Sequence, residues 1–300
     1  MGRKDKLVEE IVELIEKNYS EFEKAALHSD TDFPVDAEYK LFNSLFSKEL
    51  KDPKEIKSDI IQEVVEELEK RNLSVFILNG KKNYDGIPIS ALLNLSPEEK
   101  IEIEIKKPWN LLGMYNQKNI RIKGKVRRCL GVGMIKGEIV VEGDAEDYVG
   151  ELMKSGKIIV NGNVENYAGY HMQGGEIWVN GDAGKGLGRF MEGGRIVVNG
   201  NAEDGIGDCM FGGEIWIKKL ELKNLSPYYE IGMGKIYKGL PGEDFEPVRI
   251  FEILEKPGEG YVFFYFDKRE KNRNFTDRAE HALTTAFRAY RYIQTSENEE

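Results

Sequence analysis

The residues of this chain best suited to nucleophilic or metal chemistry are its two cysteines and three histidines. Cys209 and His171 occupy equivalent positions in repeated stretches, and a cysteine beside a histidine base is the pair that a thiol nucleophile requires. Proton transfer between them needs a separation of about 3 Å. His28 and His281 lie in stretches of helical character, where we expect surface or packing roles. No G-x-S-x-G turn of a serine hydrolase is present.

Two glycine-rich stretches and one polar column could bind ions. The stretches "LGVGMIKG" and "DAGKGLG" suggest phosphate loops, but Lys136 replaces a required glycine and Lys185 has no Ser or Thr after it. Carboxylate and amide oxygens recur in one column that could hold a cation: Asp144, Asn163, Asp182 and Asn201. The alternative is a ladder in which each of these side chains hydrogen-bonds its own corner or the next one, and we favour the ladder.

All of these residues lie in a region that repeats itself every 19 residues. Isoleucine, valine, glycine and methionine return at this step without insertions, in five full units from Asn119 to Gly213 and a partial sixth. The isoleucine column is Ile139, Ile158, Ile177, Ile196 and Ile215, and the methionine column is Met134, Met153, Met172, Met191 and Met210. A fixed period of this kind indicates a solenoid architecture.

Each unit contains one short strand and three glycine corners, with no stretch long enough for a helix. Parallel strands stack about 4.8 Å apart, so the predicted fold class is mainly β, a parallel β-helix of 19-residue coils with Ile, Val and Met inside. Stacking separates Cys209 from His171 by two coils, or roughly 9.6 Å, with Phe190 between them. It separates Cys129 from Cys209 by four coils, which predicts that no disulfide joins them.

The spacing G-x-x-G-x-x-x-G, as in "GDAEDYVGELMKSGKIIVNGN", resembles the GXGXG-repeat β-helix family. This family includes the C-terminal domain of the glutamate synthase large subunit, one of the subunits of formylmethanofuran dehydrogenase, and stand-alone archaeal relatives. The resemblance covers about residues 100 to 220 and implies a right-handed, structural β-helix whose chemistry belongs to other domains or subunits. Gly2 stands where an amidotransferase has its N-terminal cysteine, and the chain has no cysteine cluster for iron–sulfur and no barrel-sized region for flavin.

Glycine content divides the chain into three regions. No glycine occurs between Gly2 and Gly80, whereas residues 119–213 hold 22 of the 32 glycines. We predict a mostly helical N-terminal domain over residues 1–98 and the β-helix over residues 99–220. An α+β C-terminal segment over residues 221–300 is expected to cover the β-helix or its end.

Local patterns place several elements in the two flanking regions. Leu7, Ile11 and Leu14 recur at helical spacing, and a second helix is predicted to begin at Asp52 and Pro53. Apolar runs predict strands over 74–80, 101–105 and 260–267. A last helix is predicted from Thr276 onward.

An outward-facing column lies between the inward isoleucines and valines, because successive side chains of a strand point to opposite faces. After Arg121 this column is apolar, and we name its members the outer stripe: Val140, Ile159, Trp178, Val197 and Trp216. An exposed stripe with two tryptophans is unusual on a monomer, so we expect it to be covered. One candidate cover is the aromatic C-terminal region, "VFFYFD" with Phe287 and Tyr290, and the other is a partner subunit.

Composition narrows the class of protein. A net charge of −10 and a pI near 5.2 argue against nucleic acid or an anionic membrane as the main partner. No apolar run approaches the length of a membrane-spanning helix, "MGRKDKLVEE" lacks the apolar part of a signal peptide, and two cysteines fit a reducing compartment. We therefore expect a cytoplasmic protein.

These observations favour a non-catalytic structural or assembly module, with no catalytic, cofactor or metal residues of its own. By resemblance it would be an accessory subunit of an oxidoreductase assembly related to the glutamate synthase large-subunit domain, bound to partner subunits or to itself. One alternative is a scaffold similar to the corresponding subunit of formylmethanofuran dehydrogenase. Another is an independent enzyme or ligand-binding protein with a site between the β-helix and a flanking domain.

Overall fold

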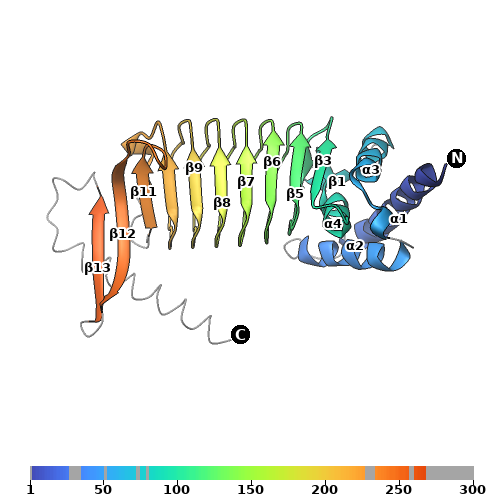
Figure 1. The fold of residues 1–300 in the computed structure, drawn as a ribbon, viewed down its shortest axis with the longest axis horizontal. Helices are drawn as coiled ribbons and strands as arrows, with labels where there is room; N and C mark the ends of the chain where they lie inside the picture. The colour runs from blue at the N-terminus through green and yellow to red at the C-terminus, as the bar shows by residue number, and fades with distance from the viewer. Residues whose placement is uncertain are drawn as a thin grey trace.

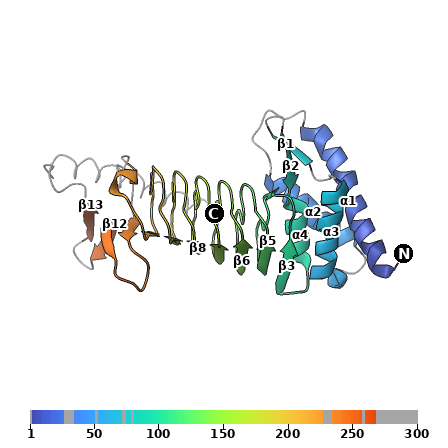
Figure 2. The ribbon, with the colours of Figure 1, turned by 90° about the horizontal axis from the view of Figure 1, so that it is seen from above.

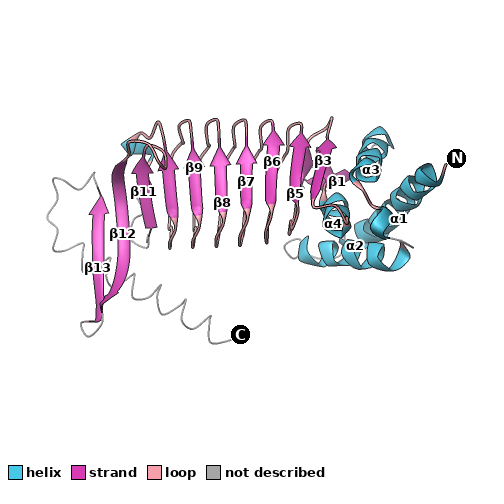
Figure 3. Cartoon of the chain, in the orientation of Figure 1, coloured by secondary structure: helices cyan, strands magenta, loops and turns pink. Residues whose placement is uncertain are grey.

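The computed structural model describes residues 2–26, 35–50, 53–71, 75–78, 81–226, 234–256 and 260–267. The described part of the chain is elongated, with a helical region at one end, a long parallel sheet in the middle and a pair of antiparallel strands at the other end (Figure 1). Figure 3 shows that the α-helices gather at the N-terminal end and that the stacked strands follow them.

The middle of the molecule is a parallel β-solenoid of about seven coils of about 19 residues, which confirms the predicted architecture. Its strands are β3 (Lys100–Glu104), β5 (Asn119–Lys123), β6 (Glu138–Glu142), β7 (Lys157–Val160), β8 (Glu176–Val179), β9 (Arg195–Val198), β10 (Glu214–Ile217) and β11 (Gly234–Lys238). Each strand is hydrogen-bonded to the next in this order. Ile158 pairs with Ile177 and Ile177 with Ile196, so like residues do stack on like.

The solenoid extends beyond the strict repeat at both ends. β3 pairs in parallel with β5 at the same 19-residue step, from Lys100 to Asn119. After Ile217 the period changes, yet the sheet continues, because Glu214 in β10 pairs with Lys235 in β11. This last coil is longer and includes the short 3₁₀ helix η2 (Leu222–Asn224).

The interior of the coils is formed by the predicted isoleucine, valine and methionine columns. All five methionines of the repeat and the inward isoleucines of β6 to β10 are at most 2% exposed. Segments outside the named strands add a further inward column of small residues, joined by isolated parallel bridges: Val126, Ala145, Val164, Ala183 and Ala202. A single continuous apolar core therefore runs along the solenoid axis.

One glycine column is required by the interior packing. Gly150 has a φ of +68°, in the left-handed region, and a Cβ there would lie 2.5 Å from Cδ1 of Ile177. Only glycine fits both the backbone conformation and the space.

The N-terminal region closes one end of the solenoid. It contains α1 (Arg3–Ala26), α2 (Val35–Glu49), η1 (Pro53–Glu55), α3 (Ser58–Arg71), β1 (Val75–Leu78), β2 (Lys81–Asp85), α4 (Ile87–Leu95) and β4 (Trp109–Asn110). α1 packs on α3 and α2 on α4, while α3 contacts β3, the first strand of the stack (Figure 2). The buried carboxylate of Glu69 in α3 accepts hydrogen bonds from Trp109 Nε1 at 2.9 Å and from the N–H of Lys107 at 3.0 Å. These bonds fix α3 against the first coil.

The helix predicted from Asp52 begins later in the structure. Residues 53–55 form the 3₁₀ turn η1, and α3 begins at Ser58. The N–H of Ser58 donates to Glu98 Oε2 at 2.7 Å, so a contact distant in sequence helps to define the helix start. The predicted strands over 74–80 and 101–105 correspond to β1 and β3.

The C-terminal part continues the same sheet with reversed strand direction. β12 (Glu246–Lys256) pairs antiparallel with β11, and β13 (Gly260–Asp267) pairs antiparallel with β12. The strand predicted over 260–267 is confirmed as β13. The helix predicted from Thr276, with Phe287 and Tyr290, lies outside the described residues. Within the described ranges, every helix is too short or too polar to cross a lipid bilayer.

Candidate interaction surface

The outer stripe lies on the flat outer face of the sheet. Figures 1 and 2 together show the strands forming one side of the solenoid and the corners lying behind them. Trp178 in β8 pairs with Ile159 in β7 on one side and with Val197 in β9 on the other. No other described segment crosses this face between β5 and β9.

Burial varies along the outer stripe, which was expected from the sequence to be covered by the C-terminal region or by a partner subunit. Val140, Ile159 and Trp178 are half-buried, whereas Val197 is 2% exposed and Trp216 is 7% exposed. Val197 is buried because it stands between the side chains of two tryptophans on the neighbouring strands.

Trp216 is covered by the chain itself. Its ring stacks on Tyr237 of β11, with ring centroids 4.0 Å apart and an angle of 22° between the planes. The ring of Phe245 contacts it edge-on at 4.9 Å, and Phe245 remains 53% exposed. Tyr237 and Phe245 belong to the segment 221–300 that was predicted to cover the β-helix or its end, and they reach only the C-terminal end of the stripe. They are not part of "VFFYFD", which was named with Phe287 and Tyr290 as the candidate cover.

A column of alternating charge borders the outer stripe on the side where the strands begin. We name it the charge ladder: Glu138, Lys157, Glu176, Arg195, Glu214 and Lys235. Arg195 lies 3.1 Å from Glu214 and 3.6 Å from Glu176, while Lys157 lies 4.0 Å from Glu176. Neighbouring charges thus have opposite signs along the whole column.

The charge ladder also holds the tryptophans in place. Trp178 Nε1 donates to Glu176 Oε2 at 2.9 Å, and Trp216 Nε1 donates to Glu214 Oε2 at 3.2 Å. The Lys157 ammonium lies 4.7 Å from the centre of the Trp178 ring, in cation–π range. Each indole therefore has a satisfied polar edge and presents its apolar surface along the stripe.

A groove occupies the N-terminal end of the same face. It is lined by Lys100, Ile101, Glu102, Asn119, Ile120, Arg121, Gly137, Glu138, Val140 and Lys157. Arg121 forms an ion pair with Glu142, and Lys123 forms one with Glu102. The face therefore has a charged, hollowed end at β3–β7 and an aromatic end at β10–β11.

The polar corner column is a hydrogen-bonded ladder, which confirms the favoured prediction. The backbone N–H groups of Asn163, Asp182 and Asn201 each donate at 2.8 Å to Oδ1 of the residue one coil earlier, beginning with Asp144. Oδ1 of Asp144, Asn163 and Asp182 is thus engaged in holding successive coils together.

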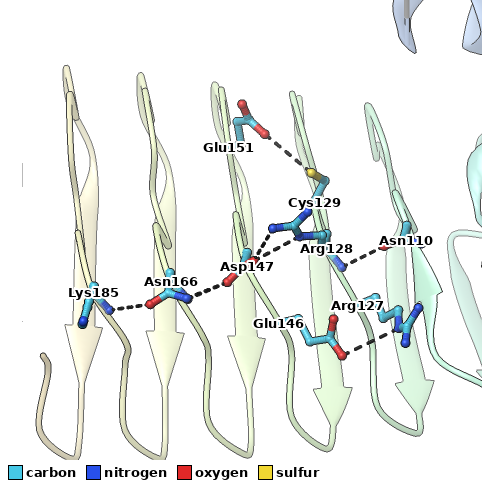
Figure 4. Close-up of polar contacts among 9 residues, drawn as sticks. All are labelled: Asn110, Arg127, Arg128, Cys129, Glu146, Asp147, Glu151, Asn166 and Lys185. Atoms are coloured by element: carbon cyan, nitrogen blue, oxygen red, sulfur yellow. Dashed lines mark hydrogen bonds and ion pairs between the residues drawn. The ribbon is translucent and has the colours of Figure 1, made fainter. Parts of the chain in front are cut away.

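A second polar ladder runs along the next corner (Figure 4). Arg128 donates twice to Asp147 Oδ2, at 2.7 and 3.0 Å, and Asp147 Oδ1 accepts from the Asn166 N–H at 3.0 Å. Asn166 in turn accepts from the Lys185 N–H at 3.0 Å. Burial alone would raise the pKa of Asp147, but the hydrogen bonds from Arg128 and Asn166 outweigh it, so the pKa is lowered.

Aromatic side chains cluster beside this second ladder, in an arrangement that was not predicted from the sequence. Tyr148 stacks on Tyr167 at 5.1 Å, and Tyr170 meets both rings edge-on. His171 stacks on Phe190 at 5.0 Å. Tyr148, Tyr167, His171 and Phe190 all have positive φ values and are half-buried. The signal was present, because these residues fall in two columns of the same 19-residue repeat.

The Cys/His pair considered from the sequence is not brought together. Phe190 stands between the coils of His171 and Cys209, and the His171 Nδ1 atom lies 3.6 Å from Glu192 Oε1. Both cysteines are free thiols, as predicted. Cys129 Sγ lies 3.6 Å from Glu151 Oε2, and burial with this neighbouring carboxylate raises the pKa of the thiol to about 12. A thiol with such a pKa is a weak nucleophile at neutral pH.

Comparison with known proteins leaves the family open. No protein-family model matches the chain, and a search of curated proteins found no match.

Proposed function

We propose that this chain is a non-catalytic scaffold that binds protein through the outer face of its sheet. The observation that carries the proposal is the outer stripe itself, in which Val140, Ile159 and Trp178 remain half-exposed beside the charge ladder. The solenoid requires its inward columns to be apolar, but nothing in the fold requires the outer column to be so. Trp178, whose indole N–H is bound by Glu176 in the charge ladder, is the kind of anchor that protein interfaces use.

The wider context of the proposal comes from the repeat. Because the spacing resembles that of the GXGXG-repeat β-helix family, we place the chain as an accessory subunit of an oxidoreductase assembly, related to the C-terminal domain of the glutamate synthase large subunit. The alternative assembly is one similar to formylmethanofuran dehydrogenase. In either setting, a right-handed solenoid would hold partner subunits while they perform the chemistry.

The opposing class, a ligand-binding protein, has one supporting observation. The groove between β3 and β7 carries charges of both signs, from Lys100, Glu102, Arg121, Glu138 and Lys157, and it lies on the side nearest the helical region. A small molecule with both an anionic and a cationic group would suit this lining.

Native isolation of the tagged chain tests the docking proposal. Trp178→Ala should abolish association with partner subunits, or with other copies of the chain, and shift the melting temperature little. Leu152→Ala is the matched control, because Leu152 is an exposed apolar residue at a corner, 43% accessible, away from the outer face. If Trp178→Ala and Leu152→Ala associate as well as the unmodified chain, the outer face is not the docking surface.

A further inference from the structure

The sign of the charge in the ladder alternates over six consecutive strands. From β6 to β11 the residues are Glu138, Lys157, Glu176, Arg195, Glu214 and Lys235. Within one chain this alternation avoids repulsion between side chains that stand about 4.8 Å apart. Between two chains it has a second consequence, because a column of alternating charge is complementary to its own reversed copy.

A two-fold axis parallel to the strands would place two outer faces against each other with the strand order reversed. If this axis passes between β8 and β9, β8 faces β9 of the other copy, β7 faces β10 and β6 faces β11. Glu176 then meets Arg195, Lys157 meets Glu214, and Glu138 meets Lys235, so all facing pairs have opposite charge. Moving the axis by half a strand spacing would bring Glu176 against Glu176, so the charges require the axis to lie between two strands. A shift by one whole spacing still places opposite charges face to face.

The same operation pairs large with small side chains in the apolar column. Trp178 faces Val197, Trp216 faces Ile159, and Tyr237 faces Val140. Trp178 and Tyr237 are half-buried and face the smaller Val197 and Val140, a size difference that lets two packed sheets interdigitate at about 10 Å. Trp216 is already covered by Phe245 of its own chain. The charge pattern therefore requires an axis between two strands, and the size pattern favours the axis between β8 and β9.

The shape of the outer face, with an exposed ring at one end and a groove at the other, fits the same arrangement. Phe245 is 53% exposed and rests on the rings of Trp216 and Tyr237, at the C-terminal end of the stripe. The groove lined by Val140, Glu138 and Lys157 lies at the opposite end. In the reversed copy these two ends face each other, so the protruding ring of one chain meets the hollow of the other.

We propose that the outer face binds a second copy of this chain in this reversed, two-fold arrangement. The inference rests on the proposed function, since it names the protein that docks on the outer face. Six strands about 4.8 Å apart, with four or five residues at about 3.3 Å each, cover a patch of roughly 29 by 15 Å. This is small for a permanent dimer, so we expect reversible association that depends on protein concentration.

Charge exchange between β7 and β10 tests the register. Sedimentation velocity over a range of concentrations should show the full chain passing from monomer to dimer. Glu214→Lys would set the introduced lysine against Lys157 of the other copy at two symmetric places, weakening the dimer about tenfold. Adding Lys157→Glu should return the dissociation constant of the dimer to within about threefold of its value for the unmodified chain. Within one chain, positions 157 and 214 are three strands apart, or about 14 Å, so they cannot rescue each other there.

Within one chain the double variant is expected to be less stable, although its dimer should be restored. The two effects are therefore opposite and can be told apart. In the double variant, the glutamate introduced in β7 stands between Glu138 and Glu176, and the lysine introduced in β10 stands between Arg195 and Lys235. Thermal stability should therefore fall while association recovers. As controls for the charge changes, we choose two exposed residues that lie outside the face, in the variants Glu165→Lys and Lys154→Glu. Neither should alter the dimer.

Three outcomes would overturn the inference. A chain that stays monomeric at every concentration would show that a second copy does not bind the outer face. If Trp178→Ala then still abolishes association with other subunits, the proposed docking function would remain supported. A dimer indifferent to Glu214→Lys and Trp178→Ala forms through another surface. A dimer weakened by Glu214→Lys but not restored by Lys157→Glu has a different register.

Discussion

The two faces of the solenoid sheet are built from the same strands but follow different rules. On the inner face every strand from β6 to β10 repeats isoleucine and then valine or isoleucine, all fully buried. On the outer face the central column changes from Glu102 and Arg121 at one end to Trp216 and Tyr237 at the other. Backbone geometry is the same for both faces, so the difference comes from what each side contacts.

The comparison separates what the fold demands from what it permits. Inside, a coil packs only on its identical neighbours, and any change in side-chain volume must be absorbed in a close-packed column. Outside, the fold is satisfied by any residue that tolerates a strand. A stretch of the outer column that is nevertheless apolar, and bordered by ordered charge, therefore points to a use beyond folding.

The largest expected effect comes from placing a charge on the inner side. Met172→Asp should unfold the solenoid, because Met172 is fully buried in the methionine column and an unpaired carboxylate there costs several kcal/mol. Circular dichroism at 25 °C should show loss of the β signal. Glu165→Ala is the control, since Glu165 is exposed and its ion partner Lys125 is 4.0 Å away. Equal melting temperatures for the two variants would contradict the assignment of inside and outside.

Adding one methyl group on the inner side tests the packing more finely. Gly150→Ala should lower the free energy of unfolding by about 2–4 kcal/mol, because its Cβ would lie 2.5 Å from Ile177 Cδ1 at a φ of +68°. Gly205→Ala has a similar φ of +86°, but its nearest neighbour would be 3.5 Å away. It should lose only about 1 kcal/mol in chemical denaturation, from backbone strain alone. Similar losses for both would mean that packing inside the coil tolerates the methyl group.

The regular part of the molecule could be predicted from the sequence because the same pattern of residues recurs in every coil. The step from Ile158 to Ile177 fixes the strand register, and the Asp144 to Asn163 spacing fixes the polar ladder, since equivalent residues in a solenoid are direct neighbours. The aromatic corner of Tyr148 and Tyr167 follows the same rule, because these two residues also stand one 19-residue step apart.

Elements that depend on a single contact could not be predicted in this way. β11 lies beyond the strict period, and its pairing with β10 is visible only in three dimensions. The start of α3 depends on a hydrogen bond from Ser58 to Glu98, 40 residues away. The burial of Trp216 depends on Phe245, which lies outside the repeat. No local pattern encodes such contacts.

Cys129, which is half-buried at a corner of its coil, should make the stability of the fold sensitive to alkaline pH. Burial and the Glu151 carboxylate raise the pKa of Cys129 from an ordinary 9.0 to about 12 in the folded protein. Because the folded pKa is the higher one, this contribution is complete below pH 9 and is lost as pH rises toward 12, by up to about 1.4 kcal/mol per pH unit. Urea unfolding at about pH 8 and about pH 10.5 should therefore show a larger loss for the unmodified chain than for Cys129→Ser. A Cys129→Ser variant that loses as much would show that other groups account for the alkaline sensitivity.

The smallest effect is expected on the outer side, where two adjacent residues of β6 give a matched pair. Val141→Thr buries a hydroxyl in the core and should cost about 1–3 kcal/mol, whereas Val140→Thr should cost less than about 0.5 kcal/mol, because Val140 is only half-buried. Both changes keep a β-branched side chain, so strand propensity is little altered.

Denaturation measured at low and high protein concentration separates the two possible covers of the stripe. If a second copy covers Val140, the cost of Val140→Thr grows with concentration, because binding stabilises only the folded chain. A cost that is large and independent of concentration would instead mean that the chain covers this residue itself.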